Sequence, residues 1–196
     1  TPHLSGLGRV FQNAWNGIYP ILDQFTTLLV APNFYLPTDS PRMINGVYSN
    51  WYDPSKNLAW GSFEGWVGGD DPVSPHNGNG QAAGVACSTY DVYDSIFAAF
   101  RNNEAYPNLQ TVYFAGHSGG GAFVSRYSAV MDDAPNDVKV KFVSANSPSF
   151  PYFTAERPDA PGNCAGYNSW MYGWDGGLTR YVQSRVGNMS ATDVFK

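Results

Sequence analysis

The sequence predicts an α/β fold built on a parallel sheet, and three observations support this class. Apolar segments typical of buried strands alternate with segments whose apolar residues recur at helical spacing. A glycine-rich turn joins one of these strands directly to a helix. The chain has 196 residues, of which 43% are hydrophobic and 16% aromatic, and this is enough for one domain with a buried core. We therefore expect residues 1–196 to form a single domain.

The N-terminal part of the chain predicts a helix followed by a strand. Between positions 9 and 25 the apolar residues recur at helical spacing; they are Val10, Phe11, Ala14, Trp15, Ile18, Leu22 and Phe25. Pro20 should kink this helix or begin its last turns afresh. Residues 27–34 form a compact apolar run and predict a buried strand. From residue 38 to 84 no period is sustained, so we expect a long, ordered, aromatic-rich loop over the sheet.

The C-terminal part predicts further helices and strands in alternation. Ser88 and Asp91 indicate the start of a helix that runs to about residue 103, because an acid three residues after a hydroxyl can form a capping box. A strand at 111–115, a helix after it and a strand at 138–145 follow. A short helix is expected at 179–186. The resulting order of strands and helices is typical of a parallel sheet with right-handed crossovers.

The turn Gly116-His117-Ser118-Gly119-Gly120 lies between the strand at 111–115 and the next helix. This is the setting of a nucleophile elbow, in which a serine is exposed on a sharp strand-to-helix turn. Glycines two positions before and two after the serine let the strand and the helix approach each other. We therefore predict that Ser118 is a catalytic nucleophile. The alternative is an ordinary glycine-rich turn whose serine bonds to the backbone.

Charge and motifs exclude several other classes of function. The net charge of -5, with only 11 Lys and Arg residues, argues against binding to nucleic acid or to an anionic membrane. No apolar run approaches the roughly 20 residues needed to span a bilayer. His and Cys residues do not cluster at metal-ligand spacing, and the glycines at 116–121 lack the lysine of a phosphate-binding loop. We expect no metal and no cofactor, and a neutral or hydrophobic substrate.

Three sequence features favour an extracellular protein. The chain begins at Thr1, as expected of a mature or cleaved product. Asn188 begins the glycosylation sequon Asn-Met-Ser. Cys87 and Cys164 are candidates for a disulfide, with each other or with a residue outside the chain, although two cysteines can equally be buried thiols.

Six segments share a pattern with known hydrolases. Residues 106–109 leading into 115–121, with Arg126 and Tyr127 downstream, are the most specific of them. The others are residues 28–34, 57–60, 68–70, 142–149 and 164–173. In these segments the chain resembles secreted and bacterial serine hydrolases of the α/β-hydrolase superfamily. The resemblance implies an α/β-hydrolase core and an esterase or related acyl hydrolase that acts through a Ser118 acyl-enzyme.

The same resemblance implies that part of the site lies outside the chain. Residues 5–9 resemble the family's oxyanion loop, with Ser5 where the family has a histidine. The backbone N–H groups of Gly119 and Leu7 are the candidate oxyanion donors. The family's acid and histidine would follow Lys196. We therefore expect an incomplete core, either a central fragment or one chain of a processed enzyme, completed by a companion polypeptide.

The chain's own histidines do not complete a triad in the usual order. They are His3, His76 and His117, and none follows Ser118. His117 should point away from its neighbour on a sharp elbow and pack beside the site, and His76 lies in the long loop. Asp175, the acid after the elbow in an aromatic setting, is expected to form a turn.

Three aromatic residues near the C-terminus are candidates for binding substrate. Flat aromatic side chains bind apolar acyl groups and stack on sugars, so Trp170, Tyr172 and Trp174 can form one wall of a substrate site, or they can equally belong to the core. A rival hypothesis is a non-catalytic carbohydrate-binding or interaction protein on a hydrolase scaffold. The lack of a histidine after Ser118 supports it.

Overall fold

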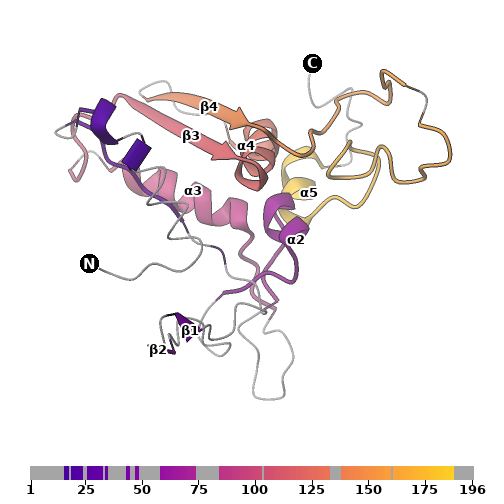
Figure 1. Cartoon of the computed structure of the whole chain (residues 1–196), viewed down its shortest axis with the longest axis horizontal. Helices are drawn as coiled ribbons and strands as arrows, with labels where there is room; N and C mark the ends of the chain where they lie inside the picture. The colour runs from indigo at the N-terminus through magenta and orange to yellow at the C-terminus, as the bar shows by residue number, and fades with distance from the viewer. Residues whose placement is uncertain are drawn as a thin grey trace.

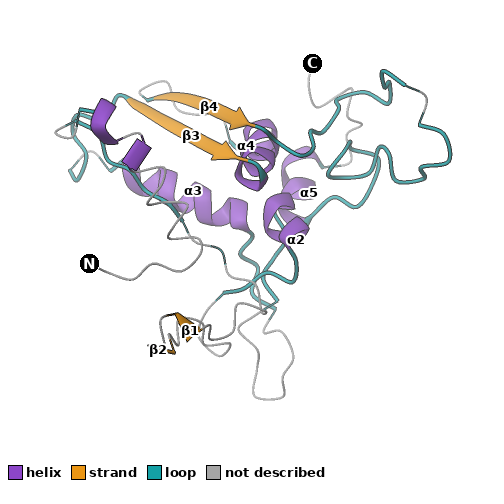
Figure 2. Cartoon of the chain, in the orientation of Figure 1, coloured by secondary structure: helices purple, strands orange, loops and turns teal. Residues whose placement is uncertain are grey.

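The computed structural model describes the chain in segments. They are residues 16–17, 19–23, 26–32, 34, 43–44, 47–48, 58–73, 84–102, 104–132, 138–159 and 161–187. The elements within them are η1 (Tyr19–Ile21), β1 (Met43–Ile44), β2 (Val47–Tyr48), α2 (Phe63–Gly68), α3 (Thr89–Phe100), β3 (Thr111–His117), α4 (Gly119–Val130), β4 (Lys139–Ala145) and α5 (Arg180–Val186). Figure 1 gives their order along the chain, and Figure 2 separates helices from strands.

Strands β3 and β4 form a two-stranded parallel sheet, with α4 between them in the sequence. The register runs from Thr111 opposite Lys139 to His117 opposite Ala145. Parallel neighbours need such a crossover connection, because a tight turn cannot join them. The mixed α/β class, the two strands and their parallel pairing are thus confirmed. Strands β1 and β2 pair antiparallel as a separate small hairpin.

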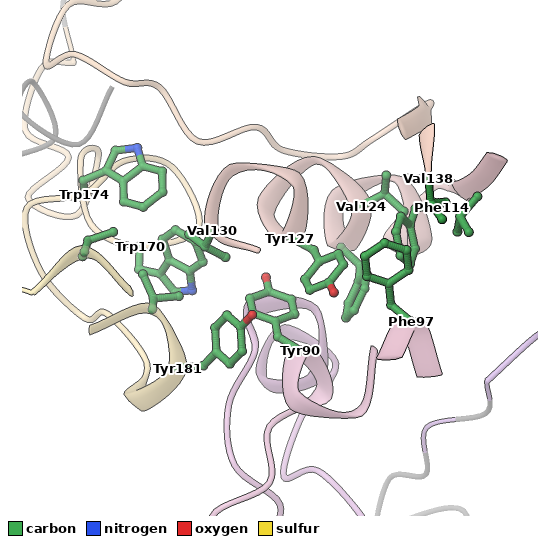
Figure 3. Close-up of a cluster of buried hydrophobic side chains, with 14 residues drawn as sticks. Tyr90, Phe97, Phe114, Val124, Tyr127, Val130, Val138, Trp170, Trp174 and Tyr181 are labelled. Carbon is green, nitrogen blue, oxygen red and sulfur yellow. The ribbon is translucent and has the colours of Figure 1, made fainter. Parts of the chain in front are cut away.

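Helices α3 and α4 cover one face of this sheet. The ring of Phe114 in β3 lies 5.8 Å from that of Phe97 in α3 and 5.4 Å from that of Tyr127 in α4 (Figure 3). It also lies 5.8 Å from the ring of Tyr93 in α3. The neighbouring Tyr113, on the other face, is 60% exposed. Within the described residues, the sheet is therefore packed on one side.

The core continues from this face toward α5. Tyr90 is fully buried and its ring lies 5.3 Å from that of Tyr181 (Figure 3). The hydroxyls of Tyr127 and Tyr181 donate hydrogen bonds of 2.6 and 2.7 Å to the two carboxylate oxygens of Asp94. The Asp94 carboxylate on α3 thus connects α4 and α5. It gives both tyrosine hydroxyls the hydrogen-bond acceptor that buried tyrosines usually have.

The predicted start of α3 is confirmed at the level of single bonds. The backbone N–H of Asp91 donates to Ser88 Oγ at 3.1 Å, and the Ser88 N–H donates to the Asp91 carboxylate at 2.7 Å. This reciprocal pair is a capping box, and it satisfies two donors that the helix itself leaves without acceptors. The helix ends at Phe100, before the predicted residue 103.

The structure corrects two predictions in the N-terminal half. Residues 27–32 are not a strand, and Leu28 and Val30 are 61% and 46% exposed. An apolar run becomes a strand only when another strand accepts its hydrogen bonds, and none of the described strands pairs with it. In addition, α2 lies inside the predicted loop, where Ser62 Oγ accepts a bond of 2.9 Å from the Gly65 N–H.

The helix predicted at 9–25 and the loop predicted at 38–84 are only partly described, and the described residues agree with the prediction in part. Residues 16–17 are helical and a 3-10 turn surrounds Pro20, but residues 9–15 of the predicted helix lie outside the described residues. The ring of Phe34 contacts Trp60 and Trp66, with centroids 5.0 and 5.8 Å apart. Trp60 and Trp66, in the described part of the predicted loop, are therefore packed in an ordered way.

Candidate active site

Ser118 occupies the single residue between β3 and α4. Its backbone has φ 55° and ψ -119°, a conformation that L-residues rarely adopt. Its side chain is exposed and caps no helical N–H group. Strained backbone of this kind costs of order 1–3 kcal/mol and collects at functional sites. The local geometry is that of a sharp strand-to-helix elbow which presents a serine hydroxyl to solvent.

Two glycines make this turn possible, and one of them is at a different position from the one predicted from sequence. A Cβ on Gly116 would lie 2.0 Å from the carbonyl oxygen of Gly120, and a Cβ on Gly121 would lie 2.6 Å from that of Ala145. A Cβ on Gly120 would meet nothing within 4 Å. The close approaches are therefore at positions 116 and 121, and the prediction that Gly120 serves this purpose is wrong. The third helical residue, rather than the second, faces β4.

Hydrogen bonds tie the elbow to the end of β4. The Ser118 N–H donates to the Ala145 carbonyl at 2.9 Å, and Ser144 Oγ donates to the Gly121 carbonyl at 2.9 Å. These bonds fix the serine at the carboxyl ends of both strands. In open α/β sheets this is the end at which ligands bind.

The candidate oxyanion donors are only partly within the described structure. Gly119 is the first residue of α4 and is buried. The first N–H groups of a helix have no intrahelical acceptor, and the helix dipole places positive charge there. Leu7 lies outside the described residues.

Of the three histidines, the structure describes His117. It is the last residue of β3, it is exposed, and its Nε2 lies 3.0 Å from Nδ2 of Asn146. Asn146 directly follows β4 and has φ 46°. The sequence analysis did not single out Asn146; its signal was an asparagine, which tolerates positive φ, directly after a strand. His3 and His76 lie outside the described residues.

The aromatic candidates separate into core and surface. Trp170 and Trp174 are each 6% exposed and belong to the core (Figure 3). Trp170 Nε1 donates to the Gly68 carbonyl at 2.8 Å, which holds the ring against α2. The sequence left open whether these tryptophans line a substrate site or belong to the core, and they belong to the core. Tyr172 is 53% exposed.

Asp175 takes part in a local turn. Its carboxylate accepts a bond of 2.5 Å from Asn168 Nδ2, and its N–H donates to the Asn168 carbonyl at 2.9 Å. Both contacts shape the segment that carries the buried tryptophans.

Arg126, two turns after Ser118 on α4, is fully buried. Its Nη1 donates to the Ala122 carbonyl at 2.8 Å, while Nη2 donates to Ser149 Oγ at 2.7 Å and to the Met171 carbonyl. Burial lowers the pKa of this guanidinium, because the charged form loses solvation. The side chain joins the helix behind Ser118 to the exit of β4 and to the aromatic segment.

The candidate disulfide between Cys87 and Cys164 is not formed, since both thiols are free. Cys164 is exposed and Cys87 is partly buried. Burial raises the pKa of the Cys87 thiol, and the nearby carboxylates of Asp91 and Asp71 raise it further, against an opposing effect of Arg180.

These environments predict unequal thiol reactivity. Without reductant, the unfolded chain should titrate two thiols with Ellman's reagent. In the native protein, iodoacetamide should modify Cys87 several-fold more slowly than Cys164, because the thiolate is the nucleophile and a raised pKa reduces its fraction. In the Cys164→Ser variant, Cys87 should be the remaining thiol and should react at the slow rate. Absence of free thiols, or faster reaction at Cys87, would contradict the structure.

The remaining sequence candidates concern modification, metals and membranes. Asn188 lies outside the described residues. In the described part of the chain, no group of three or more His, Cys, Asp and Glu side chains is placed to hold a metal ion. No described helix is long and apolar enough to cross a membrane. Comparison with protein-family models, with curated proteins and with solved structures finds no match to this chain.

Proposed function

We propose that this chain is part of a secreted serine hydrolase of the α/β-hydrolase type, an esterase or related acyl hydrolase. The observation that carries the proposal is the backbone of Ser118, which is held at φ 55° between a parallel strand and a helix with its side chain exposed. A turn serine with a purely structural role has no need of this strain. The close approaches at Gly116 and Gly121 show how tightly the surrounding backbone constrains it.

In the proposed reaction, Ser118 Oγ attacks the carbonyl carbon of an ester and loses its proton to a histidine. The backbone N–H of Gly119, with that of Leu7, stabilises the resulting oxyanion; one such donor is typically worth about 3 kcal/mol in the transition state. The alcohol leaves with the proton from the histidine, and water then hydrolyses the acyl-enzyme. The chemistry needs neither metal nor cofactor.

The histidine and its carboxylate come, in this proposal, from sequence outside this chain. A serine hydroxyl needs a general base within hydrogen-bond reach. The exposed side chain of Tyr113 and the 47% exposed Val143 support the view that more polypeptide belongs on the sheet, because parallel sheets are normally covered on both faces. A companion polypeptide that completes the sheet would also bring the base. Secretion rests on the sequon at Asn188, since the disulfide is not formed.

Labelling of the whole enzyme, with the companion polypeptide present, by a fluorophosphonate probe tests the proposal. Intact-mass analysis should show one adduct, and peptide mapping should place it on Ser118. Ser118→Ala should abolish the adduct. Ser128→Ala, an exposed serine on the same helix, should retain it.

A correctly folded, complete enzyme that no fluorophosphonate modifies would reject the proposal. That result would favour the rival hypothesis, a non-catalytic binding protein on a hydrolase scaffold. Under either hypothesis the buried Trp170 and Trp174 do not form the binding surface.

A further inference from the structure

Two of the three strained non-glycine residues of the described structure lie at the carboxyl end of the sheet. The non-glycine residues with positive φ are Ser118, Asn146 and Met171, with φ 55°, 46° and 90°. Ser118 follows β3 and Asn146 follows β4. The third residue, Met171, is connected to the exit of β4 through Arg126. The Arg126 guanidinium donates both to the Met171 carbonyl and to Ser149 Oγ, and Ser149 lies three residues beyond Asn146. Strain at functional sites marks residues whose position matters to a ligand.

Asn146 stands next to the candidate nucleophile through two independent contacts. Its Nδ2 lies 3.0 Å from Nε2 of His117, the residue before Ser118. The carbonyl of Ala145, the residue before Asn146, accepts the hydrogen bond from the Ser118 N–H. The amide and the imidazole therefore bridge the ends of the two strands beside the serine. Both residues are exposed in the described part of the chain.

The chemistry of this pair indicates what it can bind. Their mutual contact uses one N–H of the amide and one ring nitrogen. The amide oxygen, the second amide N–H and the other ring nitrogen can still exchange hydrogen bonds. An apolar group placed over them would remove these groups from water without replacing their partners, which is unfavourable. A hydroxyl or carbonyl oxygen would satisfy them.

We infer that Asn146 and His117 form a specificity-determining subsite that binds a hydroxyl or carbonyl oxygen of the substrate beside its scissile ester. This inference rests on the proposed function and deepens it, because it names the kind of ester preferred. The oxygen can belong to the acyl group or to the alcohol. In either case the enzyme prefers a hydroxylated ester to its plain alkyl counterpart.

Two matched pairs of fluorophosphonates test the subsite. In one pair the alkyl group bonded to phosphorus through carbon, which stands for the acyl group, carries or lacks a terminal hydroxyl. In the other pair the alkoxy group, which stands for the alcohol, carries or lacks it. We expect the labelling rate of Ser118 to rise about five- to ten-fold with the hydroxyl in one of the pairs, as one net hydrogen bond would produce. The pair that responds identifies the source of the oxygen.

The rate ratio within a pair should depend on Asn146. Asn146→Gly keeps a residue suited to positive φ and removes the amide, so the ratio should fall to about one. Asn146→Asp keeps the size of the side chain but exchanges the N–H donors for an acceptor, so it should also lower the rate ratio. This variant replaces Asn146→Gly in the test if the glycine variant does not fold. The control variant Asn102→Gly, in the turn after α3, should leave the rate ratio unchanged. A purely structural role of Asn146 would slow both probes equally.

The outcomes separate the subsite from the proposed function. Labelling of Ser118 with a ratio of about one in both pairs, or with a ratio that survives Asn146→Gly, would overturn the subsite and leave the hydrolase proposal intact. Failure of every probe to label Ser118 in the folded, complete enzyme would overturn both.

Discussion

Gly116→Ala is expected to lower the free energy of unfolding by about 4 kcal/mol or more. The added Cβ would lie 2.0 Å from the carbonyl oxygen and 2.2 Å from the carbonyl carbon of Gly120. Both atoms are backbone of α4, so they cannot rotate aside as a side chain would. Relief requires β3 and α4 to move apart, which disrupts the packing around Phe114 and Tyr127. Urea unfolding followed by tryptophan fluorescence would measure the loss.

Gly121→Ala and Gly120→Ala are the graded controls for this prediction. At position 121 the Cβ would lie 2.6 Å from the Ala145 carbonyl, so we expect a smaller loss of about 1–3 kcal/mol. At position 120 the space is open and the residue is helical, so alanine should raise stability by about 0.5–1 kcal/mol. Equal stabilities of the three variants would show that the elbow is not built as described.

Arg126→Ala is expected to lower the free energy of unfolding by about 3 kcal/mol or more. The change deletes a large, fully buried side chain and leaves a cavity, and it removes the donors that serve Ser149 Oγ and the Met171 carbonyl. Because these acceptors belong to the β4 exit and the aromatic segment, hydrogen exchange should increase in residues 146–149 and 168–173. Urea unfolding and exchange mass spectrometry would measure the two effects.

Two further variants separate the causes of this loss. Arg126→Met fills much of the volume without the hydrogen bonds, so its stability should lie between those of the parent and the alanine variant. Arg101→Ala, at an exposed position after α3, should change stability by less than about 0.5 kcal/mol. A neutral effect of Arg126→Ala would mean that the guanidinium does not hold these segments together.

The central β3–α4–β4 unit could be predicted from sequence because its signals are local. Val112 and Phe114 are buried as a strand run predicts, and α4 buries Ala122, Phe123, Tyr127 and Val130 at helical spacing. The capping box at Ser88 needs residues only three positions apart. The hairpin of β1 and β2 also had a local signal that the sequence analysis did not use, since Asn45 and Gly46 separate the two strands in the sequence.

The candidate site was predictable only around Ser118. Glycines next to a serine between a strand and a helix indicate an elbow, but they do not say which glycine faces which carbonyl. Gly121 faces Ala145, and Asn146 reaches His117, only because β4 pairs with β3 in one register. Both relations join residues more than 20 positions apart in the sequence, where no local pattern can report them.

Burial and partnership were decided by the tertiary structure. The apolar run at 27–32 has the composition of a strand but no partner among the described strands. For Trp170 and Trp174 the sequence left a substrate wall and the core equally open, and both lie in the core. Arg126, which composition alone would place in solvent, is fully buried because Ala122, Ser149 and Met171 offer it acceptors. Spacing, caps and turn residues act over one or two turns of chain, so they suffice for α3, β3, α4 and β4. Strand pairing, burial and the neighbours of Ser118 depend on which distant segments exclude water from one another, and only the folded chain decides that.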